Sequence, residues 1–191
     1  MAKSRDVFHD KTIVGSVYKH YAILSAVLFL FWCMLCGNFT AKFVIVGLAS
    51  SLISAYICMP LLLLESRKGD KKYFAFDVNL FKYLGYWMWL INEVRKANMD
   101  VATSVIKSEM DINPKVFKFR MVYDNPMAEA TLANSITLTP GTITIDVSDD
   151  GVYTIHALTN GAREGLMEGG MQRRIAQLFG ENCIYKEEYV E

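Results

Sequence analysis

Hydrophobic positions form two long uninterrupted runs in the first third of the chain. Residues 21–37 are seventeen positions without a charged side chain, and residues 43–64 are twenty-two more. A helix needs roughly 20 apolar residues to cross the hydrocarbon core of a bilayer. The pattern therefore predicts a two-helix transmembrane hairpin over residues 21–64. Two buried helices of a soluble core are the alternative, but they would give shorter runs with polar stripes.

A helical pattern of a different character follows over residues 73–110. Apolar residues recur at helical spacing, but the uncharged stretch at residues 83–92 is too short to span a bilayer. Trp87 and Trp89 near its middle suit the lipid headgroup zone, so we expect an amphipathic interfacial helix. A third, tilted membrane helix with snorkelling lysines is the alternative. Asn113-Pro114 ends the pattern, because the residue before a proline disfavours helical geometry.

From Lys115 onward the pattern is that of a small α+β domain, expected over residues 115–179. Pro126 opens a short helix to about Leu138, and Asp149-Asp150-Gly151 is a hairpin turn. Alternation with a period of two predicts strands at residues 115–123, 143–148 and 152–158, with a last helix at 161–179 and a closing strand at 184–190. This order is that of a ferredoxin-like split βαβ unit. A basic leader at residues 1–20 and an acidic tail at residues 180–191 flank the predicted elements.

The backbone of this domain can be predicted further at two places. Residues 139–142 carry proline and glycine at the two central positions of a type II turn, so the chain should reverse there. In the hairpin that follows, the apolar residues of both strands share a face only if paired residue numbers sum to an even number. Asp146 should then lie opposite either Thr154 or His156.

Charge is segregated along a chain whose formal net charge is zero. Residues 1–72 hold nine Lys/Arg against four Asp/Glu, whereas residues 121–191 hold four against eleven. Basic residues flank both apolar runs, and Lys42 alone lies between them, so the positive-inside bias predicts that both termini are cytoplasmic. The acidic C-terminal third excludes nucleic acid as a partner, because nucleic acid requires a positive surface. The lipid bilayer is the expected partner of the apolar part.

The four cysteines do not form a pattern of paired extracellular cysteines. Cys33, Cys36 and Cys58 lie inside the apolar runs, and Cys183 lies near the end of the chain. The spacing of Cys33 and Cys36, with Cys58 on the next helix, would allow a three-thiolate metal site. Cysteine inside a membrane is more often a small apolar residue that fills space, so we expect no metal and no cofactor.

Small residues recur every four positions in the second apolar run. Gly47, Ser51 and Ala55 fall on one face of the predicted helix. Because lipid supplies no hydrophobic force between helices, such a face brings two backbones close together. The face either docks to another subunit or packs internally against the first helix.

One block of the α+β region has a highly specific sequence. It is LANSITLTPGT, which contains Leu132, Ala133, Asn134, Thr137, Thr139, Pro140, Gly141 and Thr142, and it is followed by Asp146 and His156. In these residues the chain resembles the E-type subunit of the multisubunit Mrp-type Na⁺/H⁺ antiporters, a family with relatives in membrane-bound hydrogenase complexes. The resemblance covers about residues 21–179. It implies a subunit of a cation/proton antiporter in the bacterial inner membrane, with the block contacting other membrane subunits of the complex.

The residues restrict which part such a subunit plays. An ion path across a bilayer needs charged or coordinating groups at mid-depth, and neither apolar run contains Asp, Glu, Lys, Arg or His. We therefore expect a non-catalytic structural and assembly subunit. The alternatives are a regulatory cytoplasmic binding module of the transporter and a subunit of a related membrane-bound hydrogenase-type complex. Asp146 and His156 resemble two members of a catalytic set, but no nucleophile is tied to them by spacing. The hydroxyls of Thr137, Thr139 and Thr142 should satisfy backbone groups at the helix end and the turn.

Overall fold

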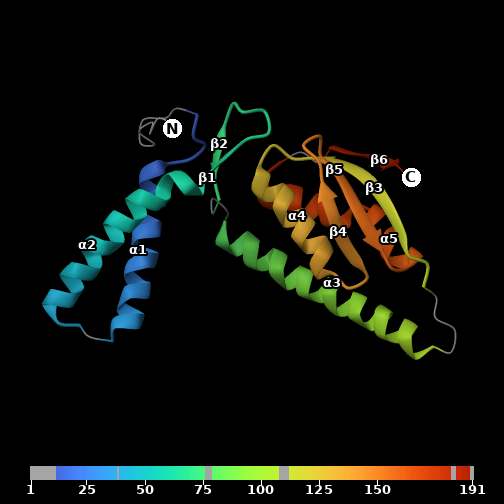
Figure 1. The fold of residues 1–191 in the computed structure, drawn as a ribbon, viewed down its shortest axis with the longest axis horizontal. Helices are drawn as coiled ribbons and strands as arrows, with labels where there is room; N and C mark the ends of the chain where they lie inside the picture. The colour runs from blue at the N-terminus through green and yellow to red at the C-terminus, as the bar shows by residue number, and fades with distance from the viewer. Residues whose placement is uncertain (1–11, 38, 76–78, 108–111, 182–183, 190–191) are drawn as a thin grey trace. The chain divides into compact units, whose positions relative to one another are not determined.

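The computed structural model describes residues 12–37, 39–75, 79–107 and 112–181 and the backbone of residues 184–189 (Figure 1). The chain divides into two compact units, Met1–Asp77 and Val78–Glu191. Most of the predicted leader at residues 1–20 lies outside the described residues.

The first unit contains two antiparallel apolar helices, α1 (Val17–Cys36) and α2 (Ala41–Cys58), which pack against each other. α1 ends at Gly37, whose φ of 58° is a left-handed conformation that glycine adopts without strain. α2 is shorter than the predicted run at residues 43–64. Because Pro60 has no N–H to donate to the preceding turn, the chain tightens into a 3₁₀ helix, η2 (Met59–Leu62). Within the described part of the chain, Val17–Cys36 and Ala41–Leu62 are the two helices long and apolar enough to cross a membrane.

A short β ribbon follows the helix pair, and the sequence pattern did not indicate it. Strand β1 (Leu63–Glu65) pairs antiparallel with β2 (Lys72–Phe74). The prediction that a helix begins at residue 73 was wrong for this reason. A parallel bridge joins Ile13 to Lys72, and a small cluster of Val17, Met59 and Phe74 holds the ribbon to the ends of the two helices.

The second unit begins with the long helix α3 (Leu80–Ile106), which lies within the range predicted for the third helix. It starts at residue 80 because Asn79 is its N-cap, with Oδ1 accepting hydrogen bonds from the backbone N–H groups of Phe81 and Lys82. Tyr86 and Leu90 on its inner face belong to the hydrophobic core of this unit.

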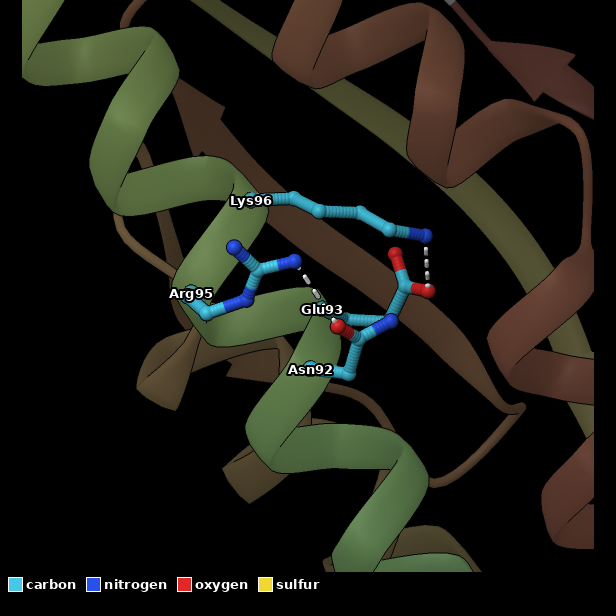
Figure 2. Close-up of polar contacts among 4 residues, drawn as sticks. All are labelled: Asn92, Glu93, Arg95 and Lys96. Atoms are coloured by element: carbon cyan, nitrogen blue, oxygen red, sulfur yellow. Dashed lines mark hydrogen bonds and ion pairs between the residues drawn. The ribbon is translucent and has the colours of Figure 1, made fainter.

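The outer face of α3 has a polar stretch near its middle, between an apolar first half and the exposed Met99, Val105 and Ile106 of its second half. Its first half exposes large apolar side chains, namely Leu80, Phe81, Leu84, Trp87, Met88 and Ile91. A polar stretch follows, in which Lys96 Nζ lies 2.9 Å from Glu93 Oε1 and Arg95 donates to Asn92 Oδ1 at 3.3 Å (Figure 2).

Four strands form the sheet of the second unit. They are β3 (Lys115–Val122), β4 (Thr142–Val147), β5 (Val152–Ala157) and β6 (Ile184–Tyr189), in the spatial order β4-β5-β3-β6, and all neighbours are antiparallel. The predicted strands and hairpin are confirmed. Residues 180–191, interpreted as a tail, contain the edge strand β6.

Three further helices connect these strands. α4 (Pro126–Leu138) joins β3 to β4 as predicted. The helix expected at residues 161–179 is in fact two helices, α5 (Asn160–Met167) and α6 (Gly170–Phe179). Gly169 separates them, because its φ of 72° interrupts the helical path.

Alternate residues of the central strands build the core of this unit. Phe117, Phe119 and Met121 of β3 are buried, and so are Tyr153 and Ile155 of β5. They pack with residues of α3, α4, α5 and α6 in one cluster. The helices therefore cover one face of the sheet, and the intervening residues of β3 and β5 lie on the opposite face.

Candidate assembly site

The LANSITLTPGT block occupies the second half of α4 and the turn into β4. Leu132, Ser135 and Ile136 are buried against the core, and Ala133 packs at its edge. The position of α4 is fixed at its start. Asn125 caps it by accepting from the N–H of Met127.

A carboxylate from the C-terminal region also holds the start of α4. Glu181 accepts hydrogen bonds from the backbone N–H of Asp124 at 2.9 Å and of Asn125 at 2.7 Å. A carboxylate that accepts hydrogen bonds from two backbone N–H groups next to a helix N-terminus interacts favourably with the helix dipole. Sequence reasoning missed this role, because Glu181 falls within the predicted acidic tail.

A buried hydroxyl pair joins the block to α3. Tyr86 Oη lies 2.6 Å from Ser135 Oγ, and the Ser135 hydroxyl itself donates to Thr131 O at 2.6 Å. Either hydroxyl of the Tyr86–Ser135 pair can be the donor. Burial raises the pKa of Tyr86 to about 12; the Ser135 hydrogen bond lowers it, and the neighbouring Tyr83 raises it by a smaller amount. Ser135 belongs to the LANSITLTPGT block, but nothing in the sequence indicated that it pairs with Tyr86.

Threonine hydroxyls satisfy the backbone at the end of α4, as expected from the sequence. Thr137 donates to Ala133 O, Thr139 to Ser135 O, and Thr142 to Ile136 O. Thr144 extends this set, because its N–H donates to Thr137 Oγ1 and its hydroxyl donates to Ala133 O. Of the carbonyl groups that a helix leaves unpaired at its C-terminus, those of Ser135 and Ile136 are thus bonded within the domain.

The turn after α4 has the predicted geometry. The N–H of Thr142 donates to Thr139 O at 3.2 Å, and Gly141 has a φ of 89°. A positive φ at the third residue is the mark of a type II turn. A Cβ on Gly141 would lie 3.6 Å from Val101 of α3 and from Ala162 of α5, so the turn sits between these two helices.

Part of the block remains on the surface of the domain. Asn134 and Thr137 are exposed, as is Leu138, and Pro140 is half-buried. No hydrogen bond of the Asn134 side chain is found within the described residues. These residues are the part of the block that a partner protein can reach.

The structure separates Asp146 from His156. A bulge between Thr144 and Asp146 shifts the register, so that Asp146 pairs with Thr154 and His156 pairs with Ile143. Of the two predicted pairings, the Thr154 one is correct and the His156 one is wrong. Because of the same bulge, Ile145 is exposed and does not share the buried face with Ile155.

The small-residue stripe of the membrane hairpin packs internally. Gly47, Ser51 and Ala55 are the buried residues of α2. Gly47 lies against the indole of Trp32, whose Nε1 donates to Phe43 O at 3.3 Å. The sequence left two alternatives for this stripe, docking to another subunit or packing against the first helix. The structure shows the second.

The described cysteines of the two apolar helices are not part of a recognisable metal site. Cys33, Cys36 and Cys58 are half-buried free thiols. Among the residues that the structure describes, no group of three or more His, Cys, Asp or Glu side chains is placed to hold a metal ion. Cys183 lies outside the described residues.

Two apolar helices followed by a small α+β domain fit a membrane protein, and comparison with known proteins identifies its family. The family described as "Na+/H+ ion antiporter subunit" matches residues 25–178. The chain therefore belongs to this family of antiporter subunits, as the LANSITLTPGT block predicted.

Individual relatives agree with this assignment. The chain is 26% identical over 164 residues to the E1 subunit of the Na⁺/H⁺ antiporter of Staphylococcus saprophyticus, and the match covers 84% of this chain and 96% of the relative. It is 28% identical over 149 residues to the E1 subunit of the Na⁺/H⁺ antiporter of Staphylococcus haemolyticus, with 77% and 87% covered.

A solved structure is also similar to the chain. It is a chain of the membrane-bound sulfane sulfur reductase, described as an archaeal respiratory membrane complex. The TM-score is 0.56 at 26% identity, over 82% of this chain and 97% of the solved one.

Proposed function

We propose that this chain is a structural and assembly subunit of a multisubunit monovalent cation/proton antiporter. Membership of the antiporter subunit family supports the transporter, and the composition of the hairpin supports the role. Residues 21–37 and 43–64 contain no Asp, Glu, Lys, Arg or His. Because ion pathways through a bilayer depend on such groups, transport belongs to other subunits, and this chain holds the complex together.

The similarity to two kinds of complex supports the same role. The relatives are named as antiporter subunits, whereas the solved structure is a respiratory complex named as a reductase. A module that is shared by assemblies with different chemistry is suited to a task that both have in common. Connecting membrane subunits to a domain outside the membrane is such a task.

The charge distribution supports a particular topology. We place α1 and α2 across the bacterial inner membrane, with both termini and the α+β domain in the cytoplasm. Basic residues precede α1 and follow α2, and Lys42 is the only one near the connection between the two helices.

The strand order supports a ferredoxin-like classification of the α+β domain. β3, α4, β4, β5, the α5–α6 pair and β6 follow the element order of a split βαβ unit. The order β4-β5-β3-β6 places each βαβ connection across an intervening strand.

The two faces of α3 support a position at the membrane interface. Its inner face packs in the core of the domain, and its outer face exposes Phe81, Leu84 and Trp87. An outer face of this kind fits the headgroup region of the bilayer. The test is a full chain in which Trp87 is the only tryptophan. Lipids brominated near the headgroup should quench it more than lipids brominated at the acyl ends, whereas the opposite order would indicate a third span.

Within the assembly, we assign partner contact to the exposed part of the LANSITLTPGT block. The test is purification of the tagged full chain from membranes in mild detergent. Large multi-span proteins should accompany the wild-type chain, and Leu138→Asp should reduce their recovery. The matched control is Gln177→Asp, because Gln177 is exposed on α6 and does not belong to the block.

The two parts of this proposal fail in different ways. A wild-type chain that purifies without membrane partners would contradict the assembly role. Equal recovery with Leu138→Asp and Gln177→Asp would leave the assembly role standing but exclude Leu138 from the contact.

A further inference from the structure

The turn between β1 and β2 is basic and has a defined shape. It covers residues 66–71, in which Arg67, Lys68 and Lys71 outnumber the single acidic residue, Asp70. The N–H of buried Ser66 donates to Lys71 O at 2.8 Å, and the N–H of Gly69 donates to Ser66 O at 2.8 Å. Gly69 has a φ of 70°, which a glycine adopts without strain. The backbone hydrogen bonds therefore fix the path of the turn, on which Lys68 is exposed and Arg67 is half-buried.

The ribbon that carries this turn is attached to one end of the helix pair (Figure 1). Phe74 of β2 packs with Val17 at the start of α1 and with Met59 just after α2. Phe74 also stacks on the His20 ring at a centroid distance of 4.0 Å. The ribbon is therefore anchored at the end of the helix pair where α1 begins and α2 ends.

The surface of this end combines positive charge with exposed apolar side chains. Residues 12–20 and 63–75 contain five Lys/Arg and two Asp/Glu. Lys19 on the first turn of α1 is exposed, and beside it in sequence Tyr18 is 67% exposed. Leu61 in η2 is 78% exposed. A soluble anion would contact only the cationic side chains. A phospholipid would pair its phosphate with the cationic side chains and pack its acyl chains against the apolar ones.

We propose that the β1–β2 turn, together with Lys19, binds the headgroup of an anionic phospholipid. The cationic side chains pair with the phosphate and other anionic oxygens of the headgroup, and the acyl chains lie along the exposed surface near Tyr18 and Leu61. The proposal rests on the membrane position of α1 and α2 within the proposed function. It does not depend on the role of the chain in antiport.

The experiment measures lipid adducts of the full chain by native mass spectrometry from mild detergent. Phosphatidylglycerol and phosphatidylcholine with the same acyl chains are the two probes. Phosphatidylglycerol should bind more strongly. One basic residue near a membrane surface contributes about 1 kcal/mol, so Lys68→Gln should weaken phosphatidylglycerol binding about fivefold. Lys68→Arg should keep the wild-type affinity.

The matched control is Lys42→Gln, because Lys42 lies at the opposite end of the helix pair. It should leave phosphatidylglycerol binding unchanged. Equal binding of the two lipids would overturn the proposal, and so would an equal loss with Lys42→Gln. Glycerol 3-phosphate that binds as tightly as phosphatidylglycerol would overturn it as well, since the site would then recognise a soluble phosphate. Retention of all variants in carbonate-washed membranes shows separately that the hairpin is inserted.

Discussion

The indole of Trp32 lies directly against the backbone of Gly47, so no side chain fits between α1 and α2 at this level. A Cβ built on Gly47 would overlap the indole atoms Cδ1, Nε1 and Cγ. A hydrogen bond from Tyr21 Oη to Leu52 O, 2.9 Å long, joins the same two helices at another level. Close approach at a small residue is thus the basis of packing within the hairpin.

This contact predicts that Gly47→Leu destabilises the hairpin itself. Because overpacking of a tight contact costs about 1–3 kcal/mol, the purified chain should unfold at a lower temperature. The double variant Gly47→Leu with Trp32→Ala should recover part of the loss, since it removes the overlapping ring. If the purified chain is unaffected while partner subunits no longer co-purify, the stripe contacts another subunit in the complex.

Gly141 predicts a different kind of defect. A valine at its φ of 89° would be strained at a cost of about 1–3 kcal/mol, although the neighbours at 3.6 Å leave room for a Cβ. Gly141→Val should therefore lower the free energy of unfolding of the domain, measured with urea. The control is Gly161→Ala, because a Cβ on Gly161 of α5 meets nothing within 4 Å. Antiport in membranes should fall in proportion to the assembled complex. A Gly141→Val complex that assembles normally but does not transport would place this turn in the mechanism.

Tyr86 predicts a pH dependence at the alkaline end. Burial raises its pKa from 10.0 to about 12, so the folded domain favours the neutral hydroxyl. The resulting stabilisation of the folded domain is fully present below pH 10 and is lost as the pH rises through 12. The difference of two pKa units corresponds to a loss of at most about 3 kcal/mol of unfolding free energy.

Comparison with Tyr86→Phe isolates this contribution from the other tyrosines. Loss of the hydrogen bond to Ser135 should cost the variant about 0.5–1.5 kcal/mol at pH 8. Between pH 10 and 12 the wild-type domain should lose more unfolding free energy than the variant. Parallel curves for the two proteins across this range would show that Tyr86 titrates normally.

Glu181 predicts that the C-terminal region stabilises α4. Glu181→Gln keeps the shape of the side chain but weakens two charge-assisted bonds to backbone N–H groups, at a cost of about 1–3 kcal/mol. Urea unfolding measures the loss. Glu164→Gln, on an exposed position of α5, is the matched control and should have little effect. Equal stability of the two variants would mean that these bonds contribute nothing.

The proposed topology predicts where single cysteines are accessible. In a chain without its native cysteines, cysteines at positions 4 and 188 should react only with reagents that reach the cytoplasm. A cysteine at position 38 should react from the outside. Accessibility of positions 38 and 188 from the same side would contradict the hairpin.

Elements with strong local periodicity were predictable from the sequence. The two uncharged runs, the alternation after Lys115 and the proline at the start of α4 each produce the expected element. Pro140 and Gly141 also specify their turn, because few residues satisfy its dihedral angles. The hydrogen bonds of the threonine hydroxyls in the block were also predictable, because their backbone carbonyl partners lie only a few residues away in the sequence.

Features that depend on distant contacts were not predictable. β1 and β2 have three residues each, too few to show alternation, and β2 is fixed by the bridge from Ile13. The bulge near Asp146 changes the register without a sequence signal of its own. Glu181 finds its N–H partners more than fifty residues away, at positions 124 and 125. Pattern reasoning also left open the face to which Gly47 packs, because both alternatives need small residues.

The bond from the N–H of Thr144 to Thr137 Oγ1 limits how another protein can join the sheet. β4 is an edge strand, and edge strands ordinarily offer free N–H groups to an incoming strand. Here the helix that precedes the strand occupies that donor, so a partner strand would first have to displace a bond within the domain. Growth of the sheet across subunits is therefore disfavoured at β4, and the proposed attachment by side chains on the surface of α4 would keep the domain a separate folding unit within a larger assembly.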